Sequence, residues 1–262
     1  MDYKKLFDLT GKVCIVTGGT GYLGTENVKI LKDFGATVVV ADIRAAEERW
    51  ANAAQPMGDL FVACDVSSSE SIRACFQKVY DTYGRLDVLV NCASYGAGYG
   101  KGSQLEYMDD ETWNKGVDGS LGVVFRGTRE AVPFMKEHGG SVINYCSMYG
   151  IVAPDLRIYG DNPQKQPPNY GAGKAGVAQF TRYAAGALAE YGIRVNAITP
   201  GPFPNPKNQD DAAFNAQLAG KTMLGRFGQS HEIAGAVLLL ASDASSFMTG
   251  SNITVDGGWT AW

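Results

Sequence analysis

Long apolar runs, basic stretches and paired cysteines are all missing from this chain. None of its apolar segments is long enough to span a bilayer, and the start Met1–Phe7 lacks the apolar stretch of a signal peptide. The net charge of -4 and the lack of a basic run argue against nucleic acid or an anionic membrane as partner. We therefore expect a cytoplasmic protein that binds neither.

The five cysteines show no paired spacing. An odd, unpaired set close to apolar strand-like segments is typical of a reducing cytoplasm. We interpret them as small buried hydrophobic residues, and we predict no metal site. They are Cys14, Cys64, Cys75, Cys92 and Cys146.

Apolar, β-branched runs alternate with longer helical patterns along the whole chain. The predicted strands are 13–16, 37–41, 60–63, 86–90, 141–145, 193–198 and 251–255; the predicted helices are 25–34, 69–83, 109–136 (one helix or two abutting ones), 170–191 and 212–218. Continuous apolar strands separated by helices indicate a parallel sheet covered on both faces. With right-handed crossovers, this predicts an α/β fold: a single-domain, Rossmann-type doubly wound parallel sheet of about seven strands over residues 1–262.

Two segments interrupt this alternation. Residues 151–169 hold four prolines among charged and polar residues. Because long loops in compact domains are usually functional, we predict an inserted loop on the substrate side. Residues 202–220 begin with a proline-rich stretch and continue into a short helical pattern, which predicts a mobile substrate loop.

A glycine-rich turn, Thr17 to Gly24, lies directly between the first predicted strand and the next helix. Its sequence is T-G-G-T-G-Y-L-G. Gly18, Gly21 and Gly24 leave backbone N–H groups open to a pyrophosphate at a helix N-terminus. Such a turn can also simply connect a strand to a helix, but its place at the start of a strand–helix–strand unit favours a dinucleotide site.

Asp42 follows the second predicted strand, about twenty residues after the turn, as in dinucleotide-binding sites. A carboxylate there accepts hydrogen bonds from the adenine ribose and repels a 2′-phosphate. The glycine turn contains no Lys or Arg that would favour that phosphate, so we predict NAD rather than NADP. Arg44 is the alternative partner for a 2′-phosphate; its other interpretation is a solvated loop charge.

Tyr170 and Lys174 lie four residues apart on a predicted helix, which places them on one face about one turn apart. A cation near a phenol favours the phenolate, and a positioned tyrosine can then exchange a proton with an alcohol oxygen. The Ser147 hydroxyl can stabilise charge developing on that oxygen. An isolated Y-x-x-x-K pair is usually a surface feature. Its position between Ser147 and Pro200-Gly201 favours a catalytic role.

In this order the motifs resemble the short-chain dehydrogenase/reductase family over essentially the whole chain. The resemblance rests on the glycine turn, Asp65-Val66, Asn91-Cys-Ala-Ser94, Ser147, Tyr170-x-x-x-Lys174, Pro200-Gly201 and Asp256-Gly-Gly258. It implies an NAD-dependent alcohol dehydrogenase in which Lys174 also holds the nicotinamide ribose. It further implies a homotetramer packed across the helix that begins at Tyr170.

The resemblance also implies roles for single residues at the cofactor. Asp65 and Val66 hold the adenine ring, Asn91 steadies the central strand, and Phe203 presents its backbone to the carboxamide. The full predicted cofactor-binding set is Gly18, Thr20, Gly21, Tyr22, Leu23, Asp42, Ile43, Asp65, Val66, Asn91, Ala93, Tyr170, Lys174, Pro200, Gly201 and Phe203.

Three departures from the family pattern stand out. Tyr22 occupies a position where compact members usually carry Gly, and the resulting glycine spacing is more typical of the extended, sugar-nucleotide branch. Ser120 stands where compact members place a catalytic Asn; we include it among the predicted catalytic residues with Ser147, Tyr170 and Lys174. The inserted segment 151–169 makes the separation of Ser147 from Tyr170 longer than usual.

The polar character of the inserted segment favours a hydroxylated substrate over a lipid or steroid. With its loop and its D-G-G-W ending the chain also resembles sugar, sugar-acid or polyol dehydrogenases, which implies such a molecule as substrate. Tyr95 and Tyr99 are candidates to stack on a sugar face, and we expect Trp259 and Trp262 to be buried, in the core or against a neighbouring subunit. Two alternatives stay open. One is a nucleotide-sugar epimerase or dehydratase of the extended branch; the other is a non-catalytic NAD-binding sensor, which the missing Asn suggests.

Overall fold

The computed structural model describes residues 2–43, 58–98, 100–160, 162, 165–206 and 211–262. Within these ranges a central sheet of seven parallel strands has the order β3-β2-β1-β4-β5-β6-β7. The α/β, Rossmann-type prediction is therefore confirmed. The strands are β1 (Val13–Thr17), β2 (Thr37–Asp42), β3 (Leu60–Ala63), β4 (Val88–Asn91), β5 (Gly140–Tyr145), β6 (Ile193–Pro200) and β7 (Asn252–Val255).

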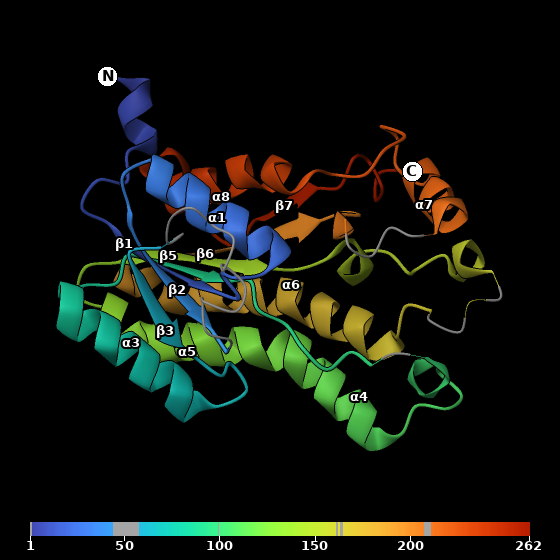
Figure 1. Ribbon diagram of the computed structural model, residues 1–262. Coiled ribbons are helices and arrows are strands. Elements are labelled where there is room, and N and C mark those ends of the chain that lie inside the picture. Colours follow the sequence, from blue (N-terminus) through green and yellow to red (C-terminus); the bar gives the residue numbers. More distant parts are fainter. Residues whose placement is uncertain (1, 44–57, 99, 161, 163–164, 207–210) are drawn as a thin grey trace.

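Helices cover both faces of the sheet (Figure 1). Helices α1 (Tyr22–Asp33) and α8 (Ala234–Ala241) pack together on one face, and α3 (Ser69–Tyr83), α5 (Val123–Met135) and α6 (Pro168–Leu188) lie on the other. Each face has its own apolar core. Helix α4 (Asp110–Val117) extends from the second face, and α7 (Ala212–Gly220) lies near the C-terminus.

The strands form because their side chains are apolar on both faces. All five residues of β1 are buried, and Val16 pairs with Val40 of β2 on one side and with Val90 of β4 on the other. Such strands are stable only with helices on both sides. The next pairing joins Thr17 to Asn91 and Ala41, which brings the carboxyl ends of three strands to one edge.

Most predicted elements are found within a few residues of their expected bounds. The strand 60–63 and the helix 69–83 match, and Ser68 begins that helix by accepting a 3.2 Å hydrogen bond from the Ser71 amide. Helix α1 begins earlier than predicted, at Tyr22. Helix α6 also begins earlier, at Pro168, because proline is favourable in the first turn.

The segment predicted as one long helix or two is helical throughout but changes its winding. Helices α4 and α5 are joined by a π-helical turn, Asp118–Gly122, which contains Ser120. Helix α6 approaches this turn closely: a Cβ at Gly173 would lie 2.6 Å from the Ser120 Cβ. Gly173 therefore has a packing role at this contact, where a larger residue does not fit without a shift, whereas nothing in the described chain lies within 4 Å of a Cβ at Gly186.

The inserted segment 151–169 is partly ordered by its own contacts. A 3-10 turn, Leu156–Tyr159, buries Ile158 and packs Tyr159 against Phe214 of α7. Residues 161, 163 and 164 of the segment lie outside the described ranges. Near the C-terminus Trp259 is buried in the chain's own core, whereas Trp262 is 72% exposed, so burial of Trp262 against a neighbouring subunit stays a prediction.

No helix in the described ranges is both long and apolar enough to cross a membrane. Those same residues contain no group of three or more His, Cys, Asp or Glu side chains placed to hold a metal ion.

Candidate active site

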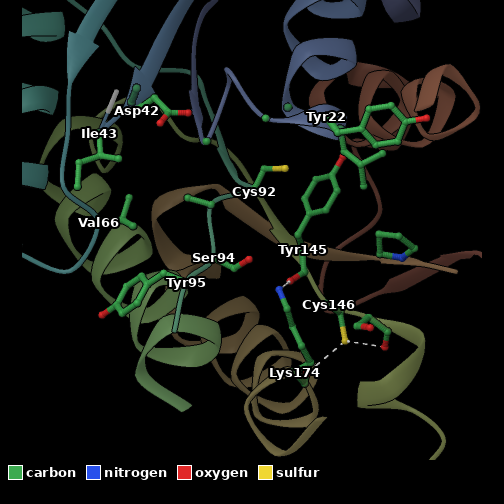
Figure 2. Close-up of a pocket in the computed structure, with 18 of the residues that line it drawn as sticks. Tyr22, Asp42, Ile43, Val66, Cys92, Ser94, Tyr95, Tyr145, Cys146 and Lys174 are labelled. Carbon is green, nitrogen blue, oxygen red and sulfur yellow. Dashed lines mark hydrogen bonds between the residues drawn. The ribbon is translucent and has the colours of Figure 1, made fainter. Parts of the chain in front are cut away.

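A cavity of about 790 Å³ lies at the carboxyl ends of the central strands (Figure 2). It brings together residues that are far apart in the sequence. Thr20, Asn91 and Ser120 are the predicted site residues that do not line it. The predicted residues that do are Gly18, Gly21, Tyr22, Leu23, Asp42, Ile43, Asp65, Val66, Ala93, Ser147, Tyr170, Lys174, Pro200, Gly201 and Phe203.

The glycine turn packs too closely for side chains. Gly18 has φ +67, and a Cβ there would lie 2.9 Å from the Ala93 Cα; a Cβ at Gly24 would lie 2.1 Å from the Gly18 carbonyl oxygen. Gly21 caps the N-terminus of α1, where free amide donors are available. The turn therefore has the open backbone that a pyrophosphate requires, and a dinucleotide fits this end of the cavity.

Asp42 is held at the end of β2 by Thr20. The Thr20 hydroxyl donates a 2.5 Å hydrogen bond to Asp42 Oδ2, and the Thr20 amide donates one of 3.2 Å to the same oxygen. Thr20 thus acts on the cavity through Asp42 instead of lining it. Figure 2 places Asp42 and Ile43 at the end opposite Lys174. Arg44, the alternative phosphate partner, lies outside the described residues.

The turn at Asp65 and Val66 is fixed by hydrogen bonds on both sides. Asp65 Oδ1 accepts from the amide of Ser67 at 2.9 Å and from its hydroxyl at 2.7 Å. Arg126 Nε donates to the Val66 carbonyl at 3.0 Å. The predicted adenine-binding residues therefore sit on backbone that is held in place before any ligand arrives.

The same Arg126 joins this turn to Tyr95 through Asp118. Two guanidinium nitrogens of Arg126 each donate a 2.8 Å hydrogen bond to Asp118, and the Tyr95 hydroxyl donates to the same carboxylate. Burial, followed by the hydrogen bond to Asp118, raises the pKa of Tyr95 to about 12. Tyr95 lines the cavity with its hydroxyl already engaged; Tyr99, the other predicted stacking residue, lies outside the described residues.

Asn91 is buried and lies behind the cavity wall. Its Nδ2 donates to Asn144 Oδ1 at 3.0 Å and to the Thr128 hydroxyl at 3.3 Å. Asn144 in turn donates to the Thr181 hydroxyl at 3.0 Å. This network ties β4 to β5 and to helices α5 and α6. Asn91 therefore contacts the neighbouring strand and helix instead of the cavity.

Ser147 follows β5 directly. Its Oγ accepts a 3.2 Å hydrogen bond from the Tyr149 amide, which leaves the hydroxyl hydrogen free to donate into the cavity. Because β5 ends at Tyr145, the strand delivers Ser147 to the same edge as the glycine turn.

Lys174 is 4% exposed, and Tyr170 lies one helical turn before it. Lys174 Nζ donates a 2.7 Å hydrogen bond to the Tyr145 carbonyl, as Figure 2 shows, and lies 5.7 Å from the centre of the Tyr170 ring. A buried ammonium needs further partners, and Lys174 has two more N–H donors to offer. The Cys146 thiol adds a 3.2 Å hydrogen bond to the Lys174 carbonyl.

Ser120 lies beneath α6 instead of facing the cavity. It is fully buried, and its Oγ has no hydrogen-bond partner among the described residues. Its contact is with Gly173, the neighbour of Lys174. A catalytic role for Ser120 therefore stays a prediction, and any such role acts through α6.

The wall beyond β6 is formed by Pro200, Gly201 and Phe203. A Cβ at Gly201 would lie 2.4 Å from the Asp256 Cα, so the D-G-G segment packs directly against it. Asp256 also accepts hydrogen bonds from the amides of Gly258 (2.9 Å) and Thr260 (2.8 Å). The predicted family motif near the C-terminus is therefore part of the support of this wall.

Several lining residues were not among the predicted site residues. They are Ala41, Cys64, Ser67, Cys92, Ser94, Lys115, Tyr145 and Cys146. Tyr145 was predictable, since it ends a strand next to Ser147. Lys115 was not predictable. Its position depends on a close contact with Gly96, which lies in the connection between β4 and α4. Burial raises the pKa of the Cys92 thiol to about 12, so it stays protonated.

Comparison with known proteins shows the family to which this chain belongs. A family model described as "Enoyl-(Acyl carrier protein) reductase" matches residues 22–260. A 3-oxoacyl-[acyl-carrier-protein] reductase of Thermotoga maritima is 36% identical over 95% of this chain and 98% of its own. A trans-4-hydroxycyclohexanecarboxylate dehydrogenase of Sinomonas cyclohexanicum is 36% identical over 95% and 93%.

A solved structure of an NADPH-dependent 3-quinuclidinone reductase from Rhodotorula rubra is also similar. It is 31% identical, covers 97% of this chain and 93% of its own, and has a TM-score of 0.85. The fold and the cavity define an oxidoreductase of the kind that binds a nicotinamide cofactor. The chain belongs to the short-chain dehydrogenase/reductase family.

Proposed function

We propose that this protein is an NAD-dependent dehydrogenase for a secondary alcohol, or the corresponding ketone, of a small polar molecule such as a sugar, sugar acid or polyol. The observation that carries the proposal is the arrangement of one cavity. Ser147, Tyr170 and Lys174 line it together with the glycine turn and Asp42. Lys174 lies at one end and Asp42, which Thr20 of the turn holds, at the other.

The residues at the catalytic end have distinct tasks. When bound, the nicotinamide ring supplies the chemistry of hydride exchange with the alcohol carbon. Tyr170 takes the hydroxyl proton in oxidation and returns it in reduction. Lys174 favours the phenolate by its charge, and its remaining N–H donors are available to hold the ribose. Ser147 donates to the substrate oxygen and stabilises the charge that develops there.

Preference for NAD is supported by Asp42. Its carboxylate is already fixed by two hydrogen bonds from Thr20, so it is oriented before the ribose arrives. A fixed negative charge accepts bonds from ribose hydroxyls and repels a 2′-phosphate. The similar 3-quinuclidinone reductase is described as NADPH-dependent, so the coenzyme must be tested directly.

The polar substrate class is supported by the inserted segment and by the relatives. The inserted segment 151–169 is rich in charged and polar residues and joins Ser147 to Tyr170, and the Sinomonas relative is named for a substrate that carries both a hydroxyl and a carboxylate. Ser120 supports the alternative of a non-catalytic NAD-binding protein, since its hydroxyl lies away from the cavity. That alternative requires NAD binding without turnover of any alcohol.

We further propose a cytoplasmic homotetramer. All five cysteines are free, which fits a reducing compartment. Tyr183 on α6 and Phe125 on α5 are 72% and 43% exposed, and apolar side chains on neighbouring helices are suited to packing against another copy. Light scattering at micromolar concentration tests the assembly; a monomer would refute it.

The function is tested by following NADH formation across sugars, aldonates, polyols and apolar alcohols, with NADP in parallel. We expect turnover with a polar secondary alcohol and a higher kcat/KM with NAD. High activity restricted to long apolar ketones would contradict the substrate class. Binding of NAD with no turnover of any alcohol would instead favour the sensor.

A further inference from the structure

Two tyrosine hydroxyls lie beside the catalytic residues without a well-formed hydrogen bond. Tyr149 is 8% exposed, its amide donates to Ser147 Oγ, and its ring belongs to the same apolar cluster as Tyr170. Within the described part of the chain its hydroxyl meets the Tyr159 hydroxyl at 3.5 Å, the limit for such a bond. Buried phenol hydroxyls usually have a good partner, so this pair has unused hydrogen-bonding capacity.

Aromatic rings surround the pair. The Trp259 ring stands edge-on to Tyr149 with centroids 6.1 Å apart, and the Phe214 ring of α7 lies 5.2 Å from that of Tyr159. Binding sites for small molecules are typically apolar walls with a few placed polar groups. The two hydroxyls are polar groups placed within this largely apolar cluster, as the hydroxyl of Tyr170 is.

Both phenols act as donors at neutral pH. Burial raises the pKa of Tyr149 above its usual value, and the proximity of Tyr159, Tyr170 and Asp155 raises it further. Burial likewise raises the pKa of Tyr159. Tyr149, Tyr159 and the catalytic Tyr170 all belong to one apolar cluster, which places the phenols near one another.

Tyr159 is held in place from outside the cluster. Asp155, which begins its turn, forms two 2.8 Å hydrogen bonds with Arg157 and an ion pair with Lys221 at the end of α7. The inserted segment and α7 are therefore tied together over the two phenols. The charges of Asp155, Arg157 and Lys221 are paired with one another in this contact. The two phenol hydroxyls are therefore the polar groups that remain available to a ligand.

We propose that Tyr149 and Tyr159 form a subsite for a second hydroxyl group of the substrate, next to the one that is oxidised. The inference rests on the proposed function. Ser147 and Tyr170 line the cavity, and Tyr149 contacts both through its amide and its cluster, so a molecule bound at these two residues lies next to the two phenols. Its second hydroxyl replaces the 3.5 Å contact with two shorter bonds. The substrate class is then a diol or polyol carried on a compact carbon skeleton.

Binding without turnover tests this subsite. Calorimetry on the NADH-saturated enzyme, which cannot oxidise an alcohol, compares cis-cyclohexane-1,2-diol with cyclohexanol, which lacks one hydroxyl. We expect the diol to bind about tenfold tighter, as one or two hydrogen bonds provide. Tyr149→Phe and Tyr159→Phe should each remove most of this difference and leave cyclohexanol binding unchanged. Tyr3→Phe, at an exposed N-terminal position, is the matched control.

Equal affinity for the two probes in the wild-type enzyme would overturn the subsite. An equal loss of affinity for both probes in Tyr149→Phe and Tyr159→Phe would also overturn it, because such a loss reports a general disturbance of the site. Tyr159 is only half-buried, so its variant remains informative if Tyr149→Phe fails to fold. Failure of the proposed function has a different signature: the preference for the diol persists, but no alcohol is oxidised.

Discussion

Lys174 Nζ lies 5.7 Å from the centre of the Tyr170 ring while donating a 2.7 Å hydrogen bond to the Tyr145 carbonyl. The strand that ends at Tyr145 therefore fixes the ammonium, and α6 fixes the phenol relative to it. Tyr145 and Lys174 are far apart in the sequence, but they lie together because β5 and α6 meet at the cavity.

Replacing Lys174 by Met keeps the length of the buried side chain and removes its charge. We expect kcat to fall by about 10²–10⁴, the range for loss of assistance to a general acid or base. The melting temperature should stay close to that of the wild-type enzyme, because a buried charge is replaced by an apolar group of similar shape. Steady-state kinetics with the best alcohol of the screen measures the effect; unchanged kcat would contradict it.

Asp42→Ser removes the carboxylate that Thr20 holds. We expect kcat/KM with NAD to fall about 10- to 100-fold, as for loss of hydrogen bonds to a charged group, and kcat/KM with NADP to rise. Parallel kinetics with both coenzymes is the measurement. If the wild-type enzyme already has the higher kcat/KM with NADP, the assignment of Asp42 is wrong.

Gly173→Ala should destabilise the fold by about 1–3 kcal/mol, because its Cβ would lie 2.6 Å from the Ser120 Cβ. Gly235→Ala on α8 is the matched control: nothing in the described chain lies within 4 Å of its added Cβ. That variant should be as stable as the wild type or more so, since alanine favours helix. Urea unfolding distinguishes them, and equal effects would refute the close contact.

Asp118→Asn tests the contact by which Arg126 of α5 holds the turn at Asp65 and Val66, the predicted adenine-binding residues. Arg126 has 14% of its side chain exposed and would lose its charged partner, whereas Asp118 is 40% exposed, so water compensates in part. We expect a loss of about 1–2 kcal/mol of unfolding free energy, less than for a fully buried pair. Affinity for NAD should fall as well, because Arg126 also holds the Val66 carbonyl. Wild-type stability and affinity would show that the link is dispensable.

Much of the fold was predictable because it depends on local apolar pattern. The buried strands around Val16, Val39 and Val90 are continuous in the sequence, and parallel packing then brings Asp42 and Ser147 to one edge. The grouping of Ser147, Tyr170 and Lys174 at one cavity follows from the same rule together with the family resemblance.

What the sequence did not reveal depends on contacts between distant segments. The orientation of Ser120 is set by a π-helical turn, which shifts the helix face and has no clear sequence signal. The charges of the inserted segment suggested a polar surface, but Asp155 is paired with Lys221, and Ile158 is buried. Nor did the sequence show that Trp262 is 72% exposed in the single chain while its indole N–H donates a 3.2 Å hydrogen bond to the Lys221 carbonyl.

The most direct test of the account is Tyr170→Phe, assayed for NADH formation and, separately, for NAD binding by calorimetry. The account predicts that turnover falls nearly to background while the dissociation constant for NAD stays within about twofold, since only the proton-transfer hydroxyl is lost. Wild-type turnover in Tyr170→Phe would contradict it.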